Sequence, residues 1–167
     1  MSERRLYLLR HATARPALPI EHDHDRALSE KGESESRALG RRLADARIDR
    51  VLCSSARRTL QTWAALERER RAPVALETTS DLYDASATQI LECIVSTPDS
   101  VAGLLVVAHN PGIAELAWQL AGGSPQRAVL EAGMRPCALA IFELDAATWY
   151  GATPADLRCV DVWTPPR

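Results

Sequence analysis

The chain has 167 residues, of which 46% are hydrophobic and 25% are charged, which is typical of one globular domain with a substantial core. Its formal net charge of −2 excludes the strong basic field that attracts nucleic acids and anionic membranes. No segment approaches the roughly 20 apolar residues of a membrane-spanning helix, and the first residues lack the apolar core of a signal peptide. We therefore expect a single domain over residues 1–167, located in the cytoplasm, with no nucleic-acid or membrane partner.

Along the first half of the chain, apolar runs of strand length alternate with segments of helical period. The first strand is expected at residues 6–9, and Ser29 then caps a helix. A short strand at 51–53 follows, and Ser54-Ser55 can cap a helix that runs from about residue 56 to residue 71. A loop around a proline leads from there to the next helix.

That next helix begins at a capping box formed by Ser86 and Gln89. The clearest buried strand is expected at 104–107, and Asn110 as N-cap with Pro111 at the first helical position marks the helix after it.

Two further strand-like runs, 138–142 and 157–162, fit a closing hairpin or edge strands. This alternation of strands and helices predicts an α/β fold with three α/β/α layers and a mainly parallel central sheet.

Basic residues follow three of the predicted strands. Arg10 and His11 come after the first, Arg57 lies in the helix after the second, and His109 comes after the strand at 104–107. Because the carboxyl ends of parallel strands meet at one edge of a sheet, we expect these side chains to converge there. Helix starts at the same edge add backbone N–H groups that favour an anion.

Two arginines and two histidines suit the chemistry of a phosphoryl group. Forked guanidinium donors match the oxygens of the phosphoryl group during its transfer, and a neutral imidazole can attack phosphorus. We expect His11 to be the neutral nucleophile and His109 to stay cationic beside the same anion.

Two other kinds of site deserve comparison with this one. The His22-Asp23-His24-Asp25 segment has metal-ligating residue types, but only His11 and His109 remain as further histidines, so we expect a solvated loop beside the pocket mouth and no metal. The four cysteines form no Cys-x-x-Cys pair, and the Cys-x5-Arg spacing of cysteine phosphatases is missing after Cys53, because Thr59 stands in the sixth position. We expect free, buried thiols.

Several segments, in the right order along the chain, resemble those of the histidine phosphatase superfamily, which includes the cofactor-dependent phosphoglycerate mutases. Leu9-Arg10-His11-Ala12 resembles the Arg-His-Gly/Ala signature, and residues 26–32 resemble an Arg-x-Leu-Thr-x-x-Gly segment. Residues 54–62 are similar to a Ser-x-x-x-Arg-x-x-x-Thr segment, and residues 107–111 to the segment that holds the second histidine.

The resemblance implies a phosphoglycerate mutase-like fold and a metal-independent phosphatase without a dissociable cofactor. It implies that His11 is phosphorylated, that Arg10 and Arg57 bind the phosphoryl oxygens, and that His109 completes the pocket. Water then hydrolyses the phosphohistidine. Asp84 stands where members of the superfamily carry the acid that protonates an alkoxide leaving group.

The small size of the chain and residues 82–86 resemble the SixA branch, which removes phosphate from phosphohistidine on a protein. A phosphorylated protein is therefore the first expected partner. A small phosphorylated metabolite, such as a sugar phosphate, is the alternative substrate, and a weakly catalytic phosphate-binding module is the alternative from another class.

Overall fold

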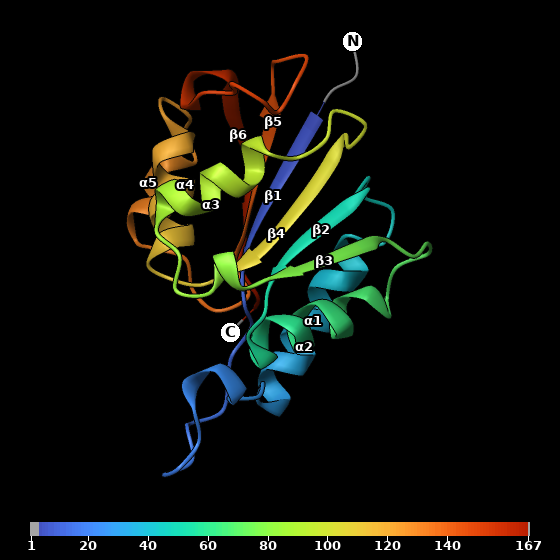
Figure 1. Ribbon diagram of the computed structural model, residues 1–167, viewed down its shortest axis with the longest axis vertical. Helices are drawn as coiled ribbons and strands as arrows, with labels where there is room; N and C mark the ends of the chain where they lie inside the picture. The colour runs from blue at the N-terminus through green and yellow to red at the C-terminus, as the bar shows by residue number, and fades with distance from the viewer. Residues whose placement is uncertain (1–3, 167) are drawn as a thin grey trace.

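Six strands form one mixed sheet in the order β3-β2-β4-β1-β5-β6, in a computed structural model that describes residues 4–166 (Figure 1). Strands β3, β2, β4 and β1 are parallel to one another, whereas β5 is antiparallel to both β1 and β6. The strands are β1 (Arg4–Arg10), β2 (Arg50–Ser54), β3 (Ala75–Thr79), β4 (Gly103–Ala108), β5 (Leu139–Leu144) and β6 (Leu157–Trp163). The expected α/β fold with a mainly parallel sheet is confirmed.

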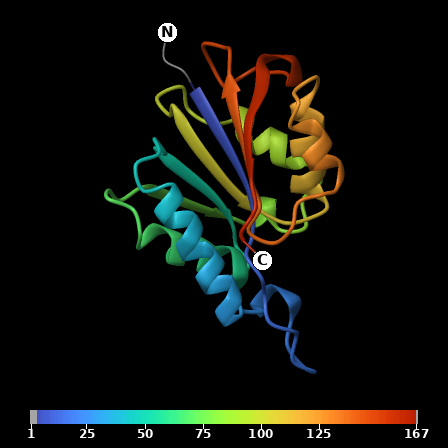
Figure 2. The same ribbon diagram turned by 180° about the vertical axis from the view of Figure 1, so that it is seen from behind.

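Helices cover both faces of this sheet (Figures 1 and 2). They are α1 (Glu30–Arg42) and α2 (Arg57–Glu67) on one face, and α3 (Ala87–Val95), α4 (Gly112–Ala121) and the short α5 (Arg127–Glu131) on the other. Successive side chains of β1 point to opposite faces of the sheet and contribute to a hydrophobic core on each. Leu6 and Leu8 pack on the side of α3 and α4, while Tyr7 and Leu9 pack on the side of α1 and α2. The three-layer arrangement follows from this two-sided burial.

Two expected helix starts are confirmed by their hydrogen bonds. The hydroxyl of Ser29 accepts from the backbone N–H of Gly32 at 3.1 Å at the start of α1. At the start of α3, Ser86 and Gln89 form the reciprocal capping box. The capping residues therefore determine where these helices begin.

At two other helix starts the expected capping residues are wrong, although each helix begins within one residue of the expected position. Helix α2 begins at Arg57 without a side-chain cap, because the hydroxyls of Ser54 and Ser55 contact imidazoles instead. Helix α4 begins at Gly112, after Pro111 rather than at it, and the Asn110 side chain points into the site described below.

The strand β3 and the helix α5 were not expected from the sequence. Strand β3 lies at the edge of the sheet, and residues 75–78 are exposed, so it lacks the apolar alternation that reveals a half-buried strand. Helix α5 has only five residues, too few for a periodic signal.

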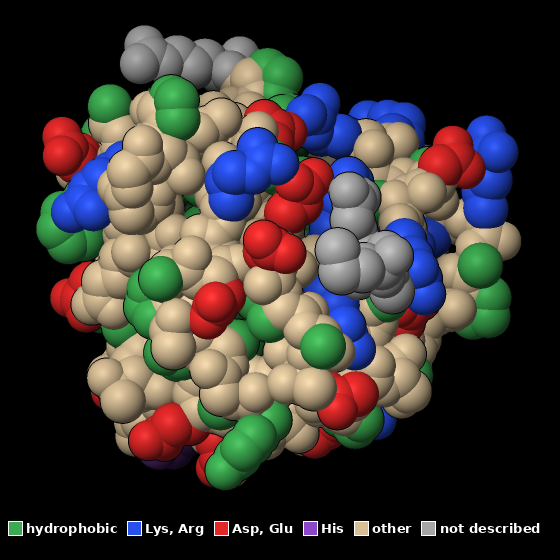
Figure 3. Space-filling view, turned by 90° about the horizontal axis from the view of Figure 1, so that it is seen from above, with side chains coloured by type: hydrophobic (Ala, Val, Ile, Leu, Met, Phe, Trp, Pro, Cys, Tyr) green, Lys and Arg blue, Asp and Glu red, His purple; other side chains and the backbone are tan. Residues whose placement is uncertain are grey.

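The carboxyl ends of β1, β2 and β4 lie together at one edge, and the connection from β1 to α1 projects beyond it (the blue segment at the bottom of Figure 1). Figure 3 views the opposite end, where basic and acidic side chains are interspersed without a field of one sign. Among the helices of residues 4–166, none is both long and apolar enough to cross a membrane.

Candidate active site

A cavity of about 480 Å³ opens at the carboxyl edge of the parallel strands. It is lined by residues from the β1–α1 connection, from α2, from the loop before α3, and from the segments after β4 and α5: Arg10, His11, Thr13, Ala14, Asp23, Arg26, Arg58, Tyr83, Asp84, His109, Asn110 and Pro136. The structure thus brings together four of the five predicted site residues. Arg57 does not line the cavity.

The His11 imidazole is held in one orientation at the end of β1. Its Nδ1 lies 2.8 Å from the carbonyl oxygen of Ala12, an acceptor, so Nδ1 carries the proton and donates it. The backbone N–H of Ala12 is held in turn by the hydroxyl of Thr62 at 3.0 Å. Nε2 therefore keeps its lone pair, and it lies 3.3 Å from Nε of Arg58.

The surroundings of His11 keep this imidazole neutral. Burial, reinforced by the positive charges of Arg58, Arg10 and Arg26, lowers its pKa from 6.5 to about 4. A neutral imidazole that is unprotonated at Nε2 is the form that can attack phosphorus once the hydrogen bond from Arg58 gives way to the substrate.

The second histidine lies beside the first, with the two ring centroids 5.2 Å apart. Nε2 of His109 contacts the Ser54 hydroxyl at 2.8 Å, and Nδ1 lies 3.3 Å from Nη2 of Arg58. Burial, together with His11 and Arg58, lowers the pKa of His109 to about 3. Burial beside a guanidinium therefore favours the neutral form of His109, and the expected cationic form beside a bound phosphoryl group stays a prediction.

Arg58 is the arginine that α2 contributes to this cavity, and it is only 5% exposed. Besides the two imidazoles, it contacts Asp23, donating from Nη1 to the backbone oxygen at 2.7 Å and from Nη2 to Oδ2 at 2.9 Å. The neighbouring Arg57 is exposed. Successive helical residues point about 100° apart, so only one of the two can face the cavity; the assignment of Arg57 is corrected to Arg58.

Two further arginines bring donors to the cavity. Nη1 of Arg10 donates to the carbonyl oxygen of Met134 at 2.8 Å, and the Asn110 amide donates to the same oxygen at 2.9 Å. The buried Nε groups of Arg10 and Arg26 have no hydrogen-bond partner within residues 4–166. Because Arg10 and Arg26 both line the cavity, their guanidinium groups suit an oxyanion bound there.

Asp23 and Tyr83 form one wall of the cavity. The Tyr83 hydroxyl donates to Oδ2 of Asp23 at 3.0 Å, and Arg26 lies 3.2 Å from Oδ1. Burial alone would raise the pKa of Asp23, but the hydrogen bonds from Tyr83 and Arg58 outweigh it and lower the pKa. The Tyr83 ring packs edge-on against His109, with centroids 5.5 Å apart. The His22–Asp25 segment therefore lies beside the mouth, as expected.

Asp84 lines the cavity from the loop before α3, with an exposed side chain and a positive φ of 54°. The first residue of α4, Gly112, packs against this loop so closely that an added Cβ would meet the Ala85 carbonyl oxygen at 1.9 Å. The structure places Asp84 at the cavity, and its role as proton donor stays a prediction.

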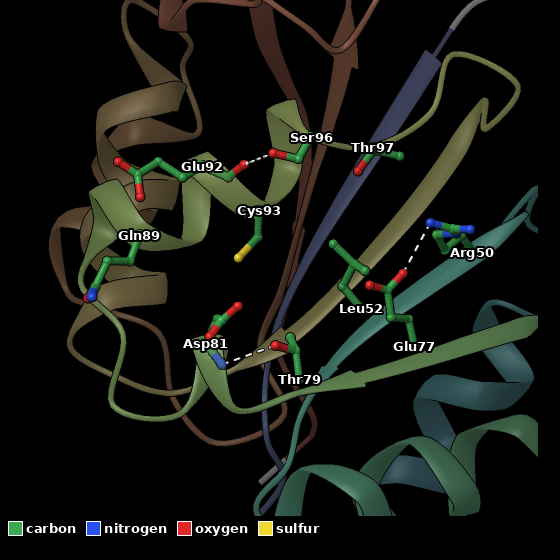
Figure 4. A pocket seen from close by; sticks show the side chains of 10 residues that line it. All are labelled: Arg50, Leu52, Glu77, Thr79, Asp81, Gln89, Glu92, Cys93, Ser96 and Thr97. Carbon is green, nitrogen blue, oxygen red and sulfur yellow. Dashed lines mark hydrogen bonds and ion pairs between the residues drawn. The ribbon is translucent and has the colours of Figure 1, made fainter.

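A second cavity, of about 420 Å³, lies between α3 and the strands β2 and β3 (Figure 4). It contains Arg50, already paired with Glu77, and further acidic side chains such as Asp81 and Glu92, but no histidine. This cavity lacks the combination of nucleophile and free guanidinium donors found at the first.

Comparison with known proteins bears on the same residues. The family described as the histidine phosphatase superfamily (branch 1) matches residues 6–87. A protein assigned as the phosphohistidine phosphatase SixA from Nakamurella multipartitia has the same fold, with a TM-score of 0.85 and 27% identity over 99% of this chain and 98% of that one. The counterpart from Agrobacterium tumefaciens has a TM-score of 0.83 and 29% identity, over 97% of this chain and 98% of that one.

The chain is thus similar to the histidine phosphatase superfamily in sequence over residues 6–87 and to SixA-type structures in fold over nearly its whole length.

Among curated relatives, the chain is 38% identical over 101 residues to an uncharacterized protein of Mycobacterium tuberculosis (strain CDC 1551 / Oshkosh). That match spans 59% of this chain and 61% of the relative, so the chain matches about three-fifths of the relative's length.

The superfamily spacing also explains the correction at the second arginine. Counted from Ser54, the Ser-x-x-x-Arg-x-x-x-Thr segment falls on Arg58 and Thr62, the residues that contact His11 and Ala12. The spacing in the sequence therefore contained the signal for Arg58. Asp23 and Tyr83 had no comparable signal, because they reach the cavity only through the fold.

Proposed function

We propose that this protein is a histidine phosphatase that hydrolyses phosphorylated substrates through a phosphohistidine intermediate on His11, without a metal or dissociable cofactor, and that protein phosphohistidine is its main substrate. The observation that carries the proposal is the geometry of His11, whose proton lies on Nδ1 while the unprotonated Nε2 accepts a hydrogen bond from Nε of Arg58, a residue that also lines the cavity. The guanidinium groups of Arg10, Arg26 and Arg58 line the same cavity and supply the donors that hold the phosphoryl oxygens.

In the first step, Arg10 and Arg58 bind the phosphoryl oxygens, with Arg58 exchanging contacts to Asp23 for contacts to the substrate. Nε2 of His11 then attacks phosphorus as the bond to the leaving group breaks. In the second step, water attacks the phosphorus on His11, which releases inorganic phosphate and restores the neutral imidazole. The guanidinium charges stabilise the negative charge that spreads over the oxygens in both steps.

The leaving group determines how much help Asp84 must give. An alkoxide needs a proton from an acid, and Asp84 is the carboxyl group that we propose for this role. An imidazole leaving group is a far weaker base, since its conjugate acid has a pKa near 6.5, so phosphohistidine needs less acid assistance. The exposed position of Asp84 fits a supporting role better than an obligatory one.

Likeness to the SixA-type structures supports a protein substrate, and a small phosphorylated metabolite is the alternative. The four cysteines form no disulfide within the described residues, which agrees with a reducing compartment and with the proposed cytoplasmic location.

The test compares His11→Ala with His22→Ala, a matched change at an exposed histidine of the neighbouring loop. Both variants and the wild type are assayed on a histidine-phosphorylated protein, on an aryl phosphate, and on a panel of sugar and acyl phosphates. We expect His11→Ala to abolish phosphate release from every substrate and His22→Ala to retain it, with the highest wild-type kcat/KM on phosphohistidine. Preference for a sugar or acyl phosphate would favour the metabolite alternative, and binding of phosphate without turnover would favour the binding module.

A further inference from the structure

The connection between β1 and α1 carries an exposed apolar segment beside the active site. Residues 16–20, Pro-Ala-Leu-Pro-Ile, are all exposed, and Leu18 and Ile20 are 57% and 96% exposed. Five consecutive exposed apolar residues are unusual on a globular protein and indicate a binding function. Both ribbon views show that this segment projects away from the body of the molecule (Figures 1 and 2).

The two ends of this connection line the cavity. Ala14 and Asp23 both belong to the cavity wall, and Leu18 is four residues from Ala14 while Ile20 is three residues from Asp23. A fully extended chain spans at most about 3.6 Å per residue, so Leu18 lies within about 14 Å of Ala14 and Ile20 within about 11 Å of Asp23. The apolar segment therefore lies within about 14 Å of the cavity wall.

Hydrogen bonds brace the segment into one shape. Arg15 and Glu21, which flank the segment, form a bidentate ion pair with N···O distances of 2.8 and 2.5 Å. This pair joins the two ends of the segment. The backbone of Leu18 is bonded in both directions, since its N–H donates to Oε2 of Glu21 and its carbonyl oxygen accepts from the Glu21 N–H, each at 3.1 Å. Two prolines further restrict the backbone. A preformed apolar surface loses little conformational entropy when a partner binds.

We infer that Leu18 and Ile20 form a docking site for the protein that carries the phosphohistidine. These two side chains would pack against an apolar patch on that protein, beside its phosphorylated histidine. This inference rests on the proposed function. A stable protein interface covers about 800 Å² on each partner, which corresponds to a radius of about 16 Å around the cavity, so a docked protein reaches the segment. A small phosphate bound in the cavity does not extend that far. The segment would thus select protein substrates over metabolites.

The test uses three phosphohistidine substrates. Two are helical peptides with a central phosphohistidine, one flanked by leucines at positions i−4 and i+3 and the other by serines, and the third is free phosphohistidine. The enzymes are the wild type, Leu18→Ser/Ile20→Ser, and the matched control Leu76→Ser/Val129→Ser, which changes two exposed apolar residues that do not line the cavity.

For the wild type we expect kcat/KM on the leucine peptide to exceed that on the serine peptide by about tenfold, since two apolar side chains are buried on docking. Leu18→Ser/Ile20→Ser should bring this ratio close to one without changing turnover of free phosphohistidine, and the control should behave like the wild type. If Leu18→Ser/Ile20→Ser lost kcat/KM equally on all three substrates, the segment would have a structural role in the cavity and the inference would be overturned. An unchanged ratio between the leucine and serine peptides in this variant would also overturn it.

Two other results have separate meanings. If the wild type hydrolyses an aryl phosphate but none of the phosphohistidine substrates, the proposed function fails and the inference fails with it. If sedimentation shows a wild-type dimer that Leu18→Ser/Ile20→Ser dissociates, the segment joins two copies of this chain, and the docking inference is overturned.

Discussion

Nε of Arg58 lies 3.3 Å from Nε2 of His11, so a guanidinium group directly adjoins the lone pair that we expect to attack phosphorus. The same guanidinium contacts His109 through Nη2. Its charge helps to keep both imidazoles unprotonated, and its fork is placed where the phosphoryl oxygens would bind. We therefore expect this one side chain both to prepare the nucleophile and to stabilise the charge of the transition state.

The pair Arg58→Ala and Arg57→Ala tests this assignment with adjacent residues of one helix. Loss of a preorganised charged donor to the transition state typically lowers the rate by about 10²–10³-fold, and we expect that loss in kcat/KM for Arg58→Ala. Arg57 is exposed and lies outside the cavity, so Arg57→Ala should stay within about twofold of the wild type. Steady-state kinetics on an aryl phosphate measures both. The reverse ranking would restore the assignment of Arg57.

The sequence and the fold contribute unequally to this site. Arg10, His11 and His109 follow strands directly, so the rule that parallel strands end at one edge was enough to bring them together. The choice between Arg57 and Arg58 depends on helix register, and the first residue of α2 was uncertain because Ser54 and Ser55 serve the histidines rather than the helix.

Other features escaped prediction for different physical reasons. The preference of His109 for its neutral form depends on burial beside Arg58, which is a property of the packed structure. The edge strand β3 has no buried face to impose alternation on its sequence.

The lowered histidine pKa values predict a pH dependence that NMR can follow. We expect the His11 and His109 ring resonances to keep neutral-imidazole shifts from pH 8 down to pH 5, because their pKa values are about 4 and about 3. Saturating inorganic phosphate should raise both pKa values, since it brings negative charge beside the rings. Titration of either ring near pH 6.5 without phosphate would contradict the proposed electrostatics.

The same shifts have a consequence for stability. Between pH 6.5 and about 4 the unfolded chain binds protons on these histidines and the folded chain does not, so the free energy of unfolding should fall as the pH falls. Each histidine contributes about 1.4 kcal/mol per pH unit over its window. Urea denaturation of the wild type and of His109→Asn measures this slope. An equal slope in the variant would contradict the assignment to His109.

Asp84→Asn separates the two leaving groups. Asparagine tolerates the positive φ at this position and has the same shape as aspartate, but it cannot donate a proton as a carboxylic acid does. Acid catalysis typically contributes about 10²–10⁴-fold, so hydrolysis of a sugar phosphate should fall by at least about 10²-fold while phosphohistidine turnover stays within about threefold. An equal loss on both substrates would eliminate this role of Asp84.

Gly112→Ala tests the contact that positions the Asp84 loop. The added Cβ would lie 1.9 Å from the Ala85 backbone oxygen, so α4 and the loop must separate, and we expect a loss of about 1–3 kcal/mol in the free energy of unfolding. Gly123→Ala is the matched control, because nothing lies within 4 Å of its added Cβ. Chemical denaturation compares the two. Equal free energies of unfolding for Gly112→Ala and Gly123→Ala would show that the Asp84 loop moves away from α4 at no cost in stability.

The central claim is that Nε2 of His11 accepts the phosphoryl group, and rapid-quench mass spectrometry tests it most directly. The enzyme is mixed with an aryl phosphate, quenched in alkali, where phosphohistidine is stable, and digested for peptide mapping. We predict one phosphoryl group on the peptide that contains His11, and none in His11→Ala. A phosphoryl group on another residue, or undiminished turnover by His11→Ala, would contradict the claim.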